Sequence, residues 1–76
     1  MIIGDEVGWQ WASGLATGTV ESINHKRTEI ESKGAHIVRN GTEDDPALVI
    51  KHSGGSKVLR LQHEVKVIKH KGGKNV

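Results

Sequence analysis

Cysteine, phenylalanine and tyrosine are absent from the sequence, which also contains only one proline and no long apolar run. Without cysteine, neither a disulfide framework nor a cysteine-ligated zinc site can form, so stability has to come from aliphatic packing and strand pairing. The lack of disulfides points to a reducing compartment. No stretch approaches the roughly 18 apolar residues of a membrane span, and the first residues lack the features of a secretory signal. We therefore expect a soluble cytoplasmic protein that does not associate with membranes.

The chain of 76 residues is long enough for one compact domain with a thin core, because a domain of this size buries only about 60% of the surface that its unfolded chain exposes. Its formal charge of +2 is too small to indicate a nucleic-acid ligand by itself. Lysines crowd the last residues, where the apolar content is too low for ordered packing. We expect residues 1–68 to form the domain and residues 69–76 to form a flexible basic tail.

Ten glycines and short apolar runs separated by turn residues are typical of a small β-barrel or sandwich. In residues 6–11 an apolar side chain occupies every second position, which predicts a strand with one apolar face. Residues 16–23 are rich in β-branched side chains and predict a second strand. Within it, Gly18 indicates a bend or the close approach of another backbone.

Two interpretations are open for residues 24–40. Ile23 and Ile30 are seven residues apart, and Arg27 with Glu31 has the spacing of a helical ion pair. However, the β-branched side chains, an internal glycine and the low apolar content favour two short strands over a helix.

The second half of the chain predicts further strands. Asn40 and Gly41 form a turn signal, followed by an acidic loop that ends at Pro46. Residues 47–52 and 57–61 predict a hairpin, and residues 62–64 a single 3₁₀ turn before the last strand. The predicted fold is therefore all-β, a barrel of five to seven short antiparallel strands. We expect its interior to contain Val7, Val20, Leu48, Ile50, Leu59, Leu61, Val65 and Val67.

The order of several short motifs resembles a known family. The motifs are Gly4-Asp5-x-Val7-x-Trp9, then Gly14 and Gly18-x-Val20, then Asp44-Asp45-Pro46 before Leu48-Val49-Ile50-Lys51, and a final Leu59-to-Val67 segment. Together they resemble the Tudor domain of the hypervirulence-associated protein family, a group of small bacterial and fungal proteins, over roughly residues 3–68. The resemblance implies an SH3-like, Tudor-like barrel that acts as a binding module.

Trp9 and Trp11 are the candidate ligand-binding residues. They are the only tryptophans, and on a strand they lie about 7 Å apart on one face. Such a pair can hold a cation, or stack on a base or a proline. The structural alternative is that one indole fills the barrel while the other covers its edge. Family members tend to carry an aromatic residue just after the Asp-Pro turn, where this chain has Ala47 and Leu48, so an aromatic cage is disfavoured.

A protein or peptide is the expected partner, and nucleic acid is the alternative. A barrel that binds DNA or RNA would use basic side chains to contact phosphates. The candidates for those contacts are Arg27, Lys51, Lys57, Arg60, Lys66 and Lys69. A third possibility is that exposed edge strands pair with a copy of the chain or with a neighbour. We expect a monomer or a weak homo-oligomer.

Neither catalysis nor a metal or other cofactor is expected. The histidines are His25, His36, His52, His63 and His70, and their spacing brings no pair together predictably. The acidic stretch at residues 43–45 lacks the pattern of a calcium loop, and residues 53–57 lack the ending of a phosphate-binding loop. A barrel with one thin core has little structure to fix a nucleophile, a base and an orienting group, so the chain is not expected to be an enzyme.

Overall fold

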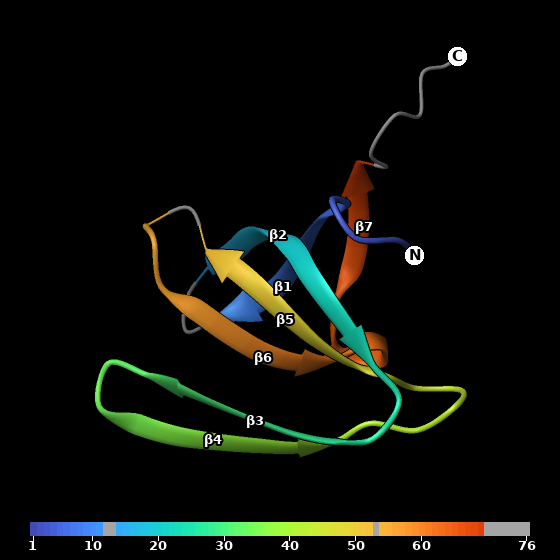
Figure 1. Cartoon of the computed structure of the whole chain (residues 1–76). Coiled ribbons are helices and arrows are strands. Elements are labelled where there is room, and N and C mark those ends of the chain that lie inside the picture. The colour runs from blue at the N-terminus through green and yellow to red at the C-terminus, as the bar shows by residue number, and fades with distance from the viewer. Residues whose placement is uncertain (12–13, 53, 70–76) are drawn as a thin grey trace.

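The computed structural model describes residues 1–11, 14–52 and 54–69, which form seven strands and one 3₁₀ turn (Figure 1). In chain order these are β1 (Glu6–Trp11), β2 (Gly14–Asn24), β3 (Arg27–Ser32), β4 (Ala35–Asn40), β5 (Ala47–His52), β6 (Lys57–Leu61), η1 (Gln62–Glu64) and β7 (Lys66–Lys69). Residues 24–40 thus contain two strands, as favoured above. Lys69 ends β7, while the rest of the predicted tail, residues 70–76, lies outside the described residues.

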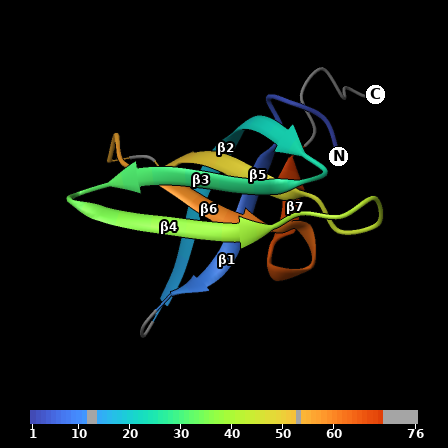
Figure 2. The same cartoon turned by 60° about the horizontal axis from the view of Figure 1, so that its bottom comes forward.

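Five strands form one antiparallel sheet in the order β6-β5-β2-β1-β7, and β3 pairs only with β4 in a separate hairpin. Figure 1 shows this hairpin as a second layer beneath β5 and β6, and in Figure 2 it crosses in front of the sheet. The predicted all-β, antiparallel, Tudor-like fold is confirmed. In the described part of the chain, however, the sheets do not close into a barrel, so β6 and β7 remain edges of the larger sheet.

The long strand β2 connects the two halves of the sheet. Its first part pairs with β1 and its second part with β5, and the register with β5 shifts between Val20 and Ser22. A bulge of this kind bends and twists a strand. At Gly18 an added Cβ would lie 2.6 Å from the Lys51 carbonyl oxygen, so only glycine allows the two strands to approach this closely. The close backbone approach predicted from the sequence is confirmed.

One apolar cluster lies on one face of the five-stranded sheet. Its buried members are Val7, Trp9, Ala16, Val20, Leu48 and Ile50. Val65 and Val67 are partly buried and pack against this cluster, as the sequence predicted. Trp9 is only 4% exposed, so the indole is part of the core.

Leu59 and Leu61 do not join this cluster. The register places Leu59 opposite Val49 and Leu61 opposite Ala47. Because cross-strand partners project to the same face, both leucines point away from the face of Leu48. Leu59 is nevertheless buried, since the β3–β4 hairpin packs against β6. The predicted burial of Leu59 is therefore confirmed, but its side chain lies on the other face of the sheet from Leu48, and Leu61 on that same face is only partly buried.

The turn before β1 is formed by Gly4 and Asp5. Gly4 has a φ of 100°, a conformation that favours glycine. The buried Asp5 accepts a hydrogen bond from the backbone N–H of Ile2 at its Oδ2, at 3.0 Å. This turn directs the chain into β1.

Candidate functional site

A groove of about 670 Å³ lies between β6 and the β3–β4 hairpin. Consecutive residues of β4, numbers 35–39, and of β6, numbers 57–60, border it, and Trp9 and Ala16 contribute to its lining from the first two strands. On β6, Val58 projects with Ile50 toward the core, whereas Leu59 projects to the opposite face. Because side chains of both faces border the groove, it runs along the edge of β6 rather than over one face of the sheet.

Basic side chains dominate the polar lining of this groove. They are Lys33, His36, Arg39, His52, Lys57 and Arg60. Among the described residues that border the groove, none is Asp or Glu. The apolar part of the lining comes mainly from Ile37, Val38, Val58 and Leu59, together with Trp9. The groove therefore combines an apolar surface with cationic groups.

Carboxylates just outside the groove partner several of these basic side chains. Lys57 Nζ lies 3.1 Å from Glu21 Oε1, and His36 Nε2 lies 2.9 Å from Glu29 Oε1. The side chains of Lys57 and His36 are 55% and 53% exposed, so these contacts lie in water. Exposed pairs of this kind contribute about 0–1 kcal/mol, which leaves both side chains available to exchange partners with a ligand.

Trp9 lies at the inner side of the groove. Its ring makes an edge-on contact with His52, with centroids 6.0 Å apart and an angle of 63° between the planes. At 4% exposure, the indole offers almost no open face to a stacked ligand. Trp11 ends β1, and its side chain lies outside the described residues, so its joint use with Trp9 stays a prediction.

The six basic residues predicted to contact phosphates do not form one surface. Lys57 and Arg60 line the groove, and Lys51 lies opposite Lys57 in the β5–β6 ladder. Arg27 forms an ion pair with Glu29 on its own strand. The remaining two, Lys66 and Lys69, lie on β7 at the opposite edge of the sheet.

Sequence reasoning missed four of the basic groove residues, Lys33, His36, Arg39 and His52. The first three belong to the β3–β4 hairpin and its turn, in which Lys33 has a φ of 52° and Gly34 a φ of 78°. The pattern of residues 24–40 predicted the two strands but gave no sign that the hairpin folds back onto β6. The docking of the hairpin is what brings these side chains to the groove.

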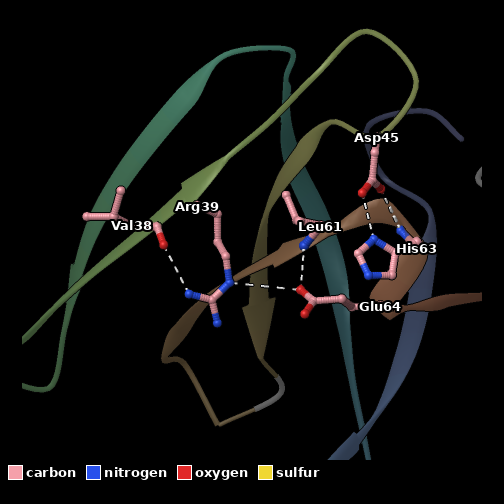
Figure 3. A network of polar contacts seen from close by, with 6 residues as sticks. All are labelled: Val38, Arg39, Asp45, Leu61, His63 and Glu64. Carbon is pink, nitrogen blue, oxygen red and sulfur yellow. Dashed lines mark hydrogen bonds and ion pairs between the residues drawn. The ribbon is translucent and has the colours of Figure 1, made fainter.

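A polar network connects the hairpin to the end of β6 (Figure 3). Arg39 donates from Nη1 to the Val38 carbonyl oxygen at 3.0 Å, and its Nε lies 3.9 Å from Glu64 Oε1. The same carboxylate oxygen accepts the Leu61 N–H at 2.8 Å. Arg39 and Glu64 therefore bridge the outer edges of β4 and β6 at one end of the groove.

The comparison with known families agrees with this architecture. A family described as the Tudor domain of hypervirulence-associated proteins matches residues 4–65. The chain belongs to this family. Neither the curated proteins nor the solved structures gave a match.

Membership in the family gives this Tudor domain a general functional class. Tudor-like domains are small binding modules, generally without catalysis, that take peptides or nucleic acids. Within residues 1–11, 14–52 and 54–69, no cluster of three or more His, Asp or Glu side chains is arranged to hold a metal ion. The same residues contain no helix of the length and apolarity that a membrane crossing requires.

A second polar contact in the Tudor domain joins the loop before β5 to η1 (Figure 3). Asp45 accepts the backbone N–H of His63 at 2.9 Å, and its other carboxylate oxygen lies 2.6 Å from His63 Nδ1. The backbone hydrogen bond is the main cause that lowers the pKa of the Asp45 carboxyl. Partial desolvation opposes this change, while the side chain and charge of His63 reinforce it.

This contact predicts a pH-dependent contribution to stability. Because the pKa of Asp45 is lower in the folded Tudor domain than its ordinary value of 3.8, its ionised form stabilises the fold above that pH. The contribution is lost as the pH falls through the lowered pKa. Asp45→Asn should therefore make the free energy of unfolding less dependent on pH below about pH 5. Urea unfolding at a series of pH values measures this. The exposed neighbour Asp44→Asn is the control, and an equal pH dependence in the two variants would refute the role of Asp45.

Proposed function

We propose that this Tudor domain is a non-catalytic module that binds a segment of a partner protein in the groove between β6 and the β3–β4 hairpin. The observation that carries the proposal is the lining of this groove, where apolar side chains lie beside basic ones and no described carboxylate intrudes. Its volume of about 670 Å³ falls in the range of about 300–1,000 Å³ that is usual for ligand sites. Trp9 takes part as an apolar wall, and Trp11 is kept as a predicted neighbour of the ligand.

Two observations favour a peptide over nucleic acid. Proteins that bind single strands use exposed aromatic faces for base stacking, and Trp9 is 96% covered within the core. In addition, a polyanion needs a continuous basic surface, whereas the fold places Lys57 and Arg60 on β6 and the lysines of β7 at the opposite edge of the sheet. A short peptide can use the apolar lining and the few cations of the groove alone.

The function is tested by titrating the isotope-labelled domain with pools of short random-sequence peptides and, in parallel, with single-stranded DNA and RNA. We expect the peptides to shift the amide signals of residues 33–39 and 57–60, and to change the tryptophan fluorescence. The variant Lys57→Glu should weaken binding by about tenfold, the effect of losing one charge-assisted contact. Lys69→Glu, on the opposite edge of the sheet, is the matched control and should bind like the unchanged protein.

Nucleic acid, the alternative ligand, would be recognised in the same experiment by the salt dependence of its affinity. About five phosphate contacts would make log K fall with log salt at a slope near −4. Affinity for DNA or RNA with this slope, together with no response to any peptide pool, would overturn the proposal. Shifts confined to β7 would place the ligand at the other edge of the sheet and would overturn it as well.

A further inference from the structure

We propose that the bound segment is an acidic strand that pairs with the outer edge of β6. This inference rests on the proposed function and adds the binding mode and the chemical class of the partner. Three features carry it: the direction of the backbone groups of β6, the facing edge of β4, and the charge of the groove.

The direction of the backbone groups along β6 follows from three hydrogen bonds. The Gln62 N–H donates to the Pro46 carbonyl oxygen at 2.9 Å, and the Ser56 carbonyl oxygen accepts the His52 N–H at 2.7 Å. Even-numbered residues therefore turn their backbone groups toward β5. The Leu61 N–H instead donates to the Glu64 side chain at 2.8 Å, on the other side of the strand.

In an antiparallel ladder the backbone groups of successive residues alternate between the two sides of the strand. The N–H and C=O groups of Lys57 and Leu59 thus point outward, as those of Leu61 do. No strand among the described residues pairs with this side of β6. An extended segment that enters the groove meets the donor and acceptor pattern of a strand edge.

The edge of β4 that faces the groove also has backbone groups that point outward. The Gly41 N–H donates to the carbonyl oxygen of Lys26, the residue before β3, so odd-numbered residues of β4 face β3. His36 and Val38 therefore turn their backbone groups outward. The Val38 carbonyl oxygen accepts a bond from Arg39, which is the residue that bridges to Glu64. The Arg39–Glu64 contact thus occupies one end of the space between two strand edges, and the remainder is open to a ligand.

The charge of the groove identifies the side chains of the incoming strand. Side chains of a strand alternate between two faces. Lys57 and Arg60 lie on opposite faces of β6, and Lys33 approaches from the turn of the hairpin. Carboxylates on either face of the incoming strand would therefore lie near a cation. A nucleic acid has no peptide backbone to pair with β6, and a second copy of this chain would bring lysines of its own edges, on β6 and β7, against these cations.

The ligand side of the proposal is tested with synthetic peptides that alternate Glu and Val. The same peptide with Lys in place of Glu should bind at least about tenfold more weakly. Two further peptides carry N-methyl groups on alternate residues, one set at odd and one at even positions. A strand that pairs through one edge loses its hydrogen bonds in only one of these sets, so one should bind at least about tenfold more weakly than the other.

The protein side uses two substitutions at one exposed position. Lys57→Ala and Lys57→Pro remove the same charge, but only proline removes the outward N–H. Proline is tolerated where the N–H of an edge strand faces solvent. The proline variant should therefore fold, with a thermal midpoint close to that of the alanine variant, and bind the acidic peptide several-fold more weakly than the alanine variant does.

The outcomes separate this inference from the proposed function. If both N-methylated peptides bind alike, or Lys57→Pro binds as well as Lys57→Ala, strand addition on β6 is overturned while peptide binding in the groove stands. Equal binding of the Lys and Glu peptides overturns the acidic class in the same way. If no peptide binds and single-stranded DNA does, both proposals fail together.

Discussion

Leu48→Ala is expected to leave a large fraction of the molecules unfolded at 25 °C. Leu48 is fully buried in the core cluster, and removing such a side chain costs about 2–5 kcal/mol. A domain of this size rarely has more than about 3–5 kcal/mol of stability in total. Because the chain contains no disulfide that could compensate, a single cavity at this position consumes nearly all of that stability.

Urea unfolding monitored by tryptophan fluorescence measures the effect, with Trp9 in the same cluster as the reporter. Val49→Ala on the same strand is the matched control. Val49 is only half-buried and projects to the other face, so its variant should lose about 1 kcal/mol. Comparable unfolding midpoints for the two variants would contradict the assignment of the core to the face of Leu48.

Gly41→Ala is expected to lower the free energy of unfolding by about 1–3 kcal/mol and to move the hairpin. An added Cβ at this position would lie 2.7 Å from the Ala47 backbone nitrogen and 2.9 Å from the Lys26 carbonyl oxygen. Both are backbone atoms, so neither can move away through a side-chain rotation. The base of the β3–β4 hairpin would have to shift away from the start of β5, and the groove wall formed by β4 would shift with it.

Amide shift mapping of the free Gly41→Ala variant tests this consequence. The signals of residues 35–40 should move, and binding of groove peptides should weaken together with stability. Gly14→Ala is the matched control, because an added Cβ there meets no atom within 4 Å. If both variants have the same unfolding midpoint and unchanged hairpin signals, the close packing around Gly41 does not position the hairpin.

The strands could be predicted from the sequence because each is a local pattern. Alternating apolar residues predicted β1, and glycine-containing turns separated the later strands. The face of Leu59 could not be predicted in this way, because it depends on the register between β5 and β6. Leu48 pairs with Arg60, which places Leu59 with Val49. A shift of one residue in the connecting turn would have reversed the faces.

The residues of the candidate site could likewise be predicted only in part from local sequence patterns. Trp9 was recognised from the sequence and does line the groove, but as a buried core residue. Lys57 and Arg60 were recognised only as members of a basic set that the fold divides between two edges of the sheet. Arg39 was missed because its place at the groove depends on tertiary packing between the hairpin and β6, and no local pattern in the chain encodes that contact.

The division of β2 between two ladders also has a consequence for folding. The ladder between β1 and β2 joins segments that are neighbours in the sequence. The ladder between β2 and β5 begins with Asn24 opposite Ala47, so it closes a loop that contains all the residues between these two. Closing such a loop costs entropy that increases with its length. The β3–β4 hairpin consists of local contacts and can form first, which shortens the free chain that remains to be closed. The segment that forms one wall of the groove would then also accelerate the pairing of β2 with β5.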